Sequence, residues 1–125
     1  MPDEEGHPTR SEMDLPTVLN ALSDPLRYEV IQVFLTLPGG TERTCLSFGL
    51  PVSKSTLSHH FRILRESGLV QQVNRGNSRK AQLRREDLEA RFPGLLDLLA
   101  ANPLARRAGA DPEPESEPGA AAPVR

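Results

Sequence analysis

The sequence contains few of the residues that build large cores or covalent cross-links. Only 4% of its 125 residues are aromatic, none is tryptophan, and the single cysteine is Cys45. A lone cysteine cannot form an internal disulfide, which is typical of a chain that stays in a reducing compartment. A core with so little apolar material is often completed by a second copy of the chain, so an oligomer is favoured.

Long apolar runs are also missing. The sequence has no stretch of about 18 apolar residues, the length that a transmembrane helix requires. It also has no basic and apolar leader at its N-terminus. We therefore expect a cytoplasmic chain that does not enter a membrane. A glycine-rich phosphate loop, clustered carboxylates and a plausible Ser-His-Asp set are absent too, so we do not expect an enzyme.

Lysine is scarce, because 13 of the 15 basic residues are arginine, and charge is unevenly distributed along the chain. The net charge of −2 hides a basic segment, residues 54–85, in which eight basic residues face one acid and give +7. Residues 1–14 carry −4 and residues 108–125 carry −3. A positive charge confined to one segment is the electrostatic pattern of a polyanion-binding surface.

Both ends of the chain are rich in proline, glycine and acidic residues. We expect residues 1–13 and 104–125 to be disordered tails, because neither can bury enough apolar surface to fold. Residues 14–103 then form one ordered domain. Its first two amphipathic helices are expected to begin at Asp14 and at the Asp24-Pro25 pair, which are favourable N-terminal caps.

The rest of the ordered domain contains both helical and strand patterns. A short helix is expected at residues 42–48, and Ser53 caps a longer one that ends before Gly68. Residues 69–73 and 79–84 read as two strands joined by a turn-rich tip. A final helical region, interrupted by a Pro-Gly pair, spans residues 86–101. This order predicts a mainly α fold with a small β-hairpin, a winged helix-turn-helix.

The helix that follows Ser53 has one apolar and one polar face. Leu57, Phe61 and Leu64 recur at the spacing of a core stripe. The candidate DNA-contacting residues at its start and on its polar face are Ser53, Lys54, Ser55, Ser58, His59 and Arg62. Short donors near a helix N-terminus can reach base edges in the major groove of double-stranded DNA. The alternative is a polar face that only contacts solvent.

The predicted hairpin tip is basic as well. Its candidate DNA-contacting residues are Arg75, Asn77, Arg79 and Lys80. A narrow tip that carries arginine suits the minor groove and the phosphates beside it, where the negative potential is deepest. Surface hairpins also carry arginine for solubility alone. Helix and hairpin together, in this order and spacing, favour DNA as the partner.

Two stretches of sequence resemble a known family. They are Leu-Ser-Asp-Pro-Leu-Arg-Tyr-Glu-Val at 22–30 and Val-Ser-Lys-Ser-Thr-Leu-Ser-His-His-Phe-Arg-Ile-Leu-Arg-Glu-Ser-Gly-Leu-Val at 52–70. With the hairpin that follows, they make residues 15–100 similar to the ArsR/SmtB family of small bacterial repressors. The resemblance implies a transcriptional repressor that works as a homodimer, with one recognition helix from each subunit. It places the base contacts at Lys54, Ser55, Ser58 and His59.

The resemblance also implies an inducer, and here the sequence departs from the family. Members that bind metal use a Cys-x-Cys pair before the recognition helix, where this chain has only Cys45. Other members use a set of Asp and His residues on the last helix, yet no histidine follows His60. A tetrahedral site needs three or four ligands, so we expect neither a metal nor a cofactor, and the inducer is not identified. We expect His60 to pack beside Phe61 and Leu64.

The sequence is compatible with two roles for Cys45. It is either a small, half-buried residue of the short helix or a redox thiol, paired across a dimer or with an electrophile.

Apolar residues of the first and last helices exceed what one surface helix needs. The candidate dimer interface consists of Leu15, Val18, Leu19, Leu22, Leu88, Phe92, Leu95, Leu96 and Leu99. The alternative is that these residues only complete the core of one subunit. A two-fold dimer would place its recognition helices about one DNA turn apart, which predicts a pseudo-palindromic operator.

Three functions are compatible with the sequence. The first is a sequence-specific repressor, bacterial and associated with the nucleoid through its DNA. The second is a winged-helix module that binds only proteins, which would not need +7 concentrated on helix and hairpin. The third is a DNA-binding sensor gated through Cys45.

Overall fold

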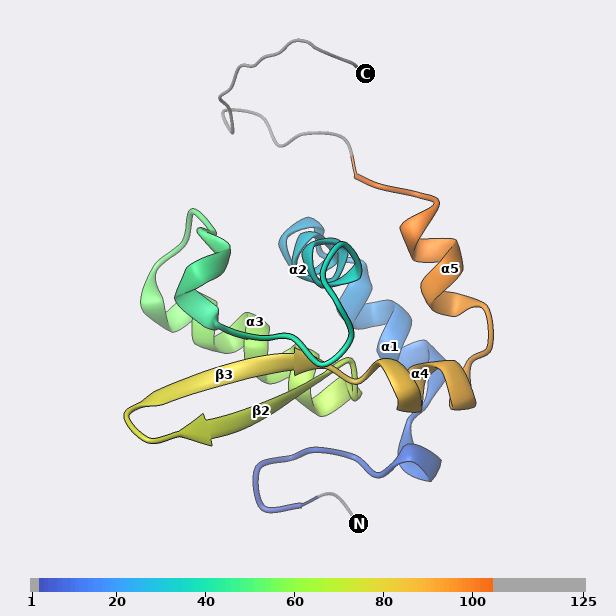
Figure 1. Ribbon diagram of the computed structural model, residues 1–125, viewed down its shortest axis with the longest axis horizontal. Helices are drawn as coiled ribbons and strands as arrows, with labels where there is room; N and C mark the ends of the chain where they lie inside the picture. Colours follow the sequence, from blue (N-terminus) through green and yellow to red (C-terminus); the bar gives the residue numbers. More distant parts are fainter. Residues whose placement is uncertain (1–2, 105–125) are drawn as a thin grey trace, which may run out of the picture.

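Side-chain caps begin the first helices of the protein, as the sequence predicted. The computed structural model describes residues 3–104. The Asp14 carboxylate accepts a hydrogen bond from the Thr17 amide (2.9 Å), and Asp24 accepts from the Leu26 amide (2.8 Å). The elements in chain order (Figure 1) are η1 (Arg10–Glu12), α1 (Leu15–Leu22), α2 (Pro25–Leu35), β1 (Glu42–Thr44), η2 (Cys45–Phe48), α3 (Lys54–Ser67), β2 (Val70–Arg75), β3 (Ser78–Leu83), α4 (Arg85–Arg91) and α5 (Leu95–Ala100).

The predicted long helix is α3. The Ser53 hydroxyl caps it by accepting from the Thr56 amide (3.2 Å), and Gly68 ends it in the left-handed conformation with φ 93°. A side chain at Gly68 would also place its Cβ 2.8 Å from the Met13 Cγ. Position 68 therefore requires glycine both because its φ is positive and because Met13 occupies the space of a Cβ.

A three-stranded antiparallel sheet, ordered β1-β3-β2, lies beside these helices. The hairpin of β2 and β3 forms the wing and projects from the helical body in Figure 1. The third strand, β1, corrects the expectation of a helix over residues 42–48. Glu42 pairs with Gln82 and Thr44 with Lys80 in β3, so only Cys45–Phe48 is helical.

The N-terminal segment differs from the expected disordered tail. Residues 3–13 lie along the domain, beneath β2 in Figure 1, and Met13 is only 1% exposed. The Pro8 carbonyl accepts from Arg84 (2.7 Å), the Met13 carbonyl accepts from Arg91 (3.0 Å), and Arg10 pairs with Asp87 (2.8 Å). These contacts hold the segment on the domain, although its composition gives it little apolar surface to bury. The tail expected at 104–125 lies outside the described residues, apart from Leu104.

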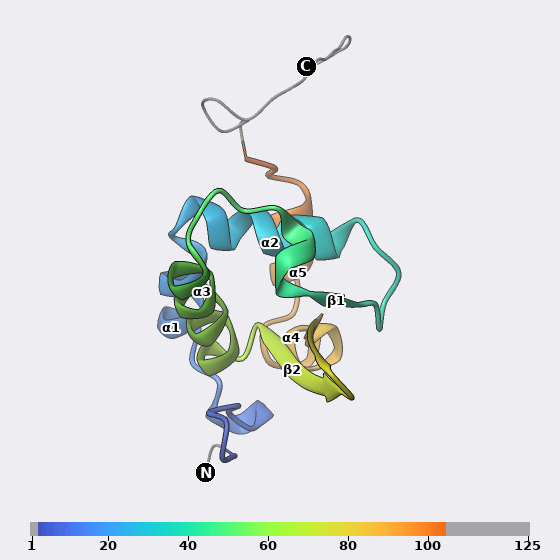
Figure 2. The same cartoon turned by 90° about the vertical axis from the view of Figure 1, so that its left-hand side faces the viewer.

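One apolar core joins the helices to the sheet. Its largest fully buried side chains are Phe34, Phe61, Met13, Ile31, Leu64, Leu69, Leu88, Val18, Val30 and Val70. Figure 2 shows α1 beside α3, with α2 across them and the sheet below. In the described part of the chain, no helix is long and apolar enough to cross a membrane.

Most of the residues expected at the dimer interface also contribute to the core of the single subunit. The interface candidates that the subunit buries in its own core are Val18, Leu22, Leu88, Leu95, Leu96 and Leu99. Leu15 and Leu19 on α1 are exposed, and Phe92 is partly buried. Periodicity identifies the apolar face of a helix, but it does not say whether that face meets the same subunit or another. Leu98 on α5, 61% exposed, was not among the candidates.

Candidate nucleic-acid interface

The polar face of α3 is open to solvent. The exposed candidates on or before this helix are Ser53, Lys54, Ser55, Ser58, His59 and Arg62. The Ser53 hydroxyl already caps the helix, so its role at a DNA interface would be to stabilise the first turn of α3. Arg62 donates to the His59 Nδ1 (3.2 Å), which orients two of the longest side chains on this face.

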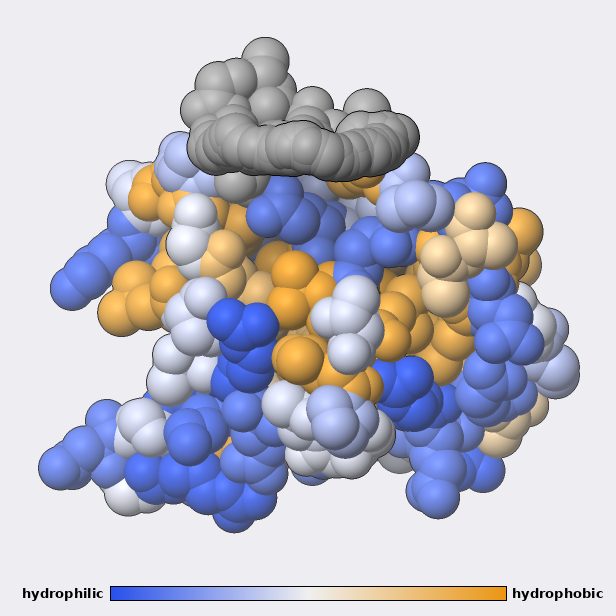
Figure 3. Space-filling model, turned by 45° about the horizontal axis from the view of Figure 1, so that its top comes forward, coloured by the Kyte–Doolittle hydropathy of each residue, from blue (hydrophilic) through white to orange (hydrophobic). Residues whose placement is uncertain are grey.

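The wing presents the remaining candidates. Arg75, Asn77 and Arg79 are exposed and Lys80 is half-buried. Arg75 forms a two-pronged ion pair with Glu42 of β1, with Nε–Oε1 at 2.9 Å and Nη2–Oε2 at 2.5 Å. The hydrogen bonds from Arg75 hold the pKa of the Glu42 carboxyl below its usual range. This pair ties the base of the wing tip to β1 and fixes the Arg75 side chain. Figure 3 shows the projecting wing as strongly hydrophilic.

A cleft of about 540 Å³ lies between α3 and the wing. Its lining includes Lys54, Ser58 and Arg65 from α3, and Asn77 and Arg79 from the wing. Helix and wing therefore turn their polar side chains toward one shared space. Sequence reasoning missed Arg65, although it follows Ser58 by seven residues and therefore lies on the same side of the helix.

Cys45 lies at the edge of the same cleft and is half-buried. The Gln72 side-chain amide donates to its Sγ at 3.7 Å. Burial raises the pKa of the Cys45 thiol, and this outweighs the opposing hydrogen bond from Gln72. The thiol is therefore protonated at neutral pH, the less nucleophilic form.

A buried polar contact fixes α3 against α2. Arg27, which is 9% exposed, donates from Nε to the Ala21 carbonyl (2.8 Å) and from Nη1 to the His60 Nδ1 (3.0 Å). His60 is buried beside Phe61, as expected. Because its Nδ1 accepts from a guanidinium, the ring is neutral, and burial lowers the pKa of His60 below its ordinary value.

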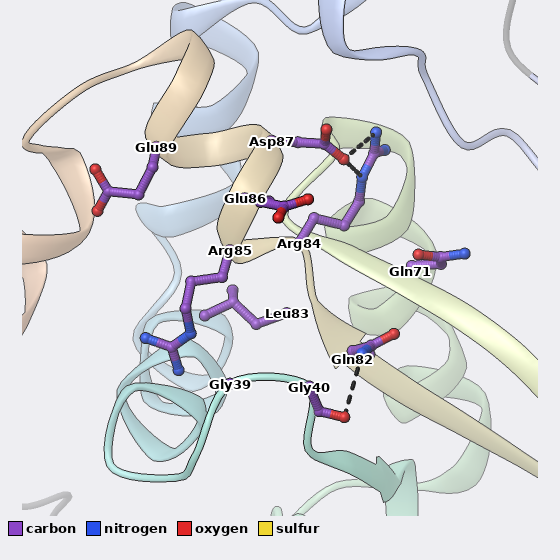
Figure 4. Close-up of a pocket in the computed structure, with 10 residues that line it drawn as sticks. All are labelled: Gly39, Gly40, Gln71, Gln82, Leu83, Arg84, Arg85, Glu86, Asp87 and Glu89. Atoms are coloured by element: carbon purple, nitrogen blue, oxygen red, sulfur yellow. Dashed lines mark hydrogen bonds and ion pairs between the residues drawn. The ribbon is translucent and has the colours of Figure 1, made fainter.

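A second cleft, of about 610 Å³, lies beside α4 (Figure 4). Its two arginines are already engaged: Arg84 bonds Asp87 (3.0 Å), and Arg85 donates to the Phe34 and Leu37 carbonyls (3.1 and 3.2 Å). Among the described residues that line this cleft, no cation is therefore free for a polyanion. Within residues 3–104, no three His, Cys, Asp or Glu side chains lie close enough together to hold a metal ion.

Comparison with known proteins agrees with this geometry. A sequence model of bacterial regulatory proteins of the arsR family matches residues 43–72, which span most of β1, all of η2 and α3, and the start of β2. The chain is 31% identical over 84 residues to the uncharacterized HTH-type transcriptional regulator YceK of Bacillus subtilis (strain 168). That match covers 66% of this chain and 82% of the relative.

Solved structures are similar as well. The crystal structure of a possible transcriptional regulator for arsenical resistance superposes with a TM-score of 0.51 at 28% identity, over 70% of this chain and 96% of that one. An ArsR-like transcriptional regulator from Rhodococcus sp. RHA1 is 28% identical, with a TM-score of 0.47, over 70% of this chain and 80% of that one. The relatives are transcriptional regulators and not enzymes, in agreement with the sequence. The chain belongs to the ArsR family of DNA-binding transcriptional regulators, whose winged helix-turn-helix it shares.

Proposed function

We propose that this regulator is a homodimeric repressor that binds a pseudo-palindromic operator through α3 and the wing. The observation that carries the proposal is the shared cleft, toward which helix and wing direct Lys54, Ser58, Asn77 and Arg79. A helix that enters the major groove reads base edges with such donors, while an arginine-bearing tip follows the neighbouring minor groove.

Exposed leucines support the dimer. Leu15 and Leu19 on α1 and Leu98 on α5 are 41%, 50% and 61% exposed in the single subunit. An α1–α5 surface shared by two copies would remove these side chains from water. The two copies of α3 would then lie about 34 Å apart, one turn of DNA, as a two-fold operator requires.

The regulator is proposed to act without a metal. The residues that the structure describes bring no three metal-binding side chains together, and the family's Cys-x-Cys pair is reduced here to Cys45. Arsenical resistance appears in the name of one structural relative and is a property of that protein. Repression, in place of activation, follows the usual role of the family.

The direct test is titration of the protein's own promoter, and of a scrambled duplex, by gel shift at several salt concentrations. We expect a preference for the promoter and a logarithmic salt slope near −0.9 for each phosphate contacted. Lys54→Ala and His59→Ala should reduce the preference, whereas Arg91→Gln, which removes a positive charge from α4, should not. Absence of any sequence preference at every salt concentration would favour the protein-binding module instead.

A further inference from the structure

The N-terminal arm, residues 3–13, reaches the basic cleft. The carboxylate of Glu5 forms an ion pair with Arg79 of the wing. The backbone carbonyl of the same residue accepts from the Nε of Arg65 on α3 (2.6 Å). Both arginines line the cleft between α3 and the wing. One acidic residue of the arm therefore contacts the helix and the wing together.

Neighbouring contacts fix the arm in this position. The His7 Nε2 accepts from the Gln72 amide of β2 (3.0 Å), and its Nδ1 lies 2.8 Å from the Asp3 carboxylate. Gly6 has φ 92° and approaches α3 so closely that an added Cβ would lie 3.2 Å from the Glu66 Cγ. Glu5 is therefore held at the cleft by backbone and ring contacts on either side of it.

Glu5 presents its carboxylate to one guanidinium group and its backbone carbonyl to another, and so occupies the position that a phosphate would prefer. Arginine binds carboxylate and phosphate with the same donors. When a helix enters the major groove and a wing the adjacent minor groove, a phosphate backbone runs between them. Arg65 and Arg79 border that space, and Glu5 contacts both. A phosphate placed between these two side chains would compete with Glu5 for the donors that Glu5 contacts.

We propose that Arg65 and Arg79 form a phosphate-binding subsite, which Glu5 occupies in the free protein, so that the arm competes with DNA. This inference rests on the proposed function. The contacts described for Glu5 involve none of the four residues at which base contacts are expected, Lys54, Ser55, Ser58 and His59, so the arm should not affect sequence reading. Its effect is a lower affinity for every duplex, and the competition weakens as salt screens the ion pair.

The test compares Glu5→Gln with Glu4→Gln in the full chain. Both variants remove one negative charge, but Glu4 forms none of the arginine contacts described for Glu5. Fluorescence anisotropy with the promoter duplex should show up to about fivefold tighter binding for Glu5→Gln at low salt, the upper end for an exposed ion pair. The gain should shrink as salt rises. Glu4→Gln should change affinity by less than about twofold.

Two further readouts separate the outcomes. In the double variant Arg65→Gln/Arg79→Gln, adding Glu5→Gln should have no effect on DNA affinity, because both arginine partners of Glu5 are then absent. Saturating DNA should also speed hydrogen exchange of the Gln72 amide, which the His7 ring protects in the free protein. Equal tightening by both glutamate variants, or unchanged Gln72 protection, would overturn the competition while DNA binding itself stands. If no variant prefers the promoter, the proposed function fails and the inference fails with it.

Discussion

A neutral histidine at the α2–α3 contact makes stability depend on pH. Burial lowers the pKa of His60 in the folded protein, whereas its value in the unfolded chain is close to 6.5. Between these two pKa values the unfolded chain binds more protons than the folded one. The contribution of His60 is therefore complete above pH 6.5 and is lost as the pH falls toward the folded pKa.

We expect His60→Asn to remove this part of the pH dependence. Asparagine retains an acceptor for Arg27 but does not titrate. Urea unfolding between pH 7 and 5 should therefore show a smaller loss of stability on acidification in the variant than in the parent protein. Identical pH profiles for His60→Asn and the parent would show that His60 does not titrate in this range.

The raised pKa of the Cys45 thiol leads to a second prediction at this scale. At neutral pH the folded protein should react with iodoacetamide more slowly than the same chain unfolded in urea, because less thiolate is present. Mass spectrometry of the alkylated fraction over time measures both rates. A faster reaction in the folded state would support the thiol sensor, as would an operator affinity that differs between oxidised and reduced protein.

At the scale of elements, the end of α3 depends on a glycine for two reasons. Gly68 has a positive φ, and Met13 lies where its Cβ would be. Gly49 also has a positive φ, but in the described part of the chain no heavy atom beyond its two chain neighbours lies within 4 Å of its Cβ position. Gly49→Ala should lower the free energy of unfolding by about 1–2 kcal/mol for the backbone alone, and Gly68→Ala should lower it by more. Equal losses in urea titrations would mean that Met13 moves aside without cost.

Local signals made the helices predictable from the sequence. Asp14, Asp24 and Ser53 satisfy the backbone amides within three residues of themselves, so the signal and the structure occupy the same short segment. Strand β1 was missed because its three residues show no apolar alternation, and its partners lie about forty positions later in β3. The arm was missed for the same reason, since Glu5 and His7 are held by residues of α3, β2 and β3.

The sequence predicted that the polar face of α3 is exposed, but it did not predict the ion pairs that surround the candidate site. Spacing alone separated the core side of α3 at Leu57 and Phe61 from its polar side. The Glu42–Arg75 and Glu5–Arg79 ion pairs depend on the fold that brings distant segments together. No local pattern marks such pairs, and they alter which arginines are free for DNA.

At the scale of the whole molecule, assembly depends on the exposed leucines. Leu98→Arg should convert the proposed dimer to a monomer, because a charge would be buried at the α5 surface. Leu46→Arg is the matched control, since Leu46 is at least as exposed as Leu98 but lies on η2 beside the cleft. Sedimentation velocity distinguishes the two states. The proposed interface would be contradicted if both variants stayed dimeric or if the parent protein were a monomer.

The arm has a further consequence for the sheet. Among residues 3–104, β2 has a strand partner on one side only, β3, and on its other side the His7 ring accepts from the Gln72 amide. Exposed strand edges recruit strands from other molecules and lead to aggregation. If DNA displaces the arm, it also uncovers this edge. Variants with a loosened arm should therefore associate edge to edge and lose solubility when they are concentrated without DNA.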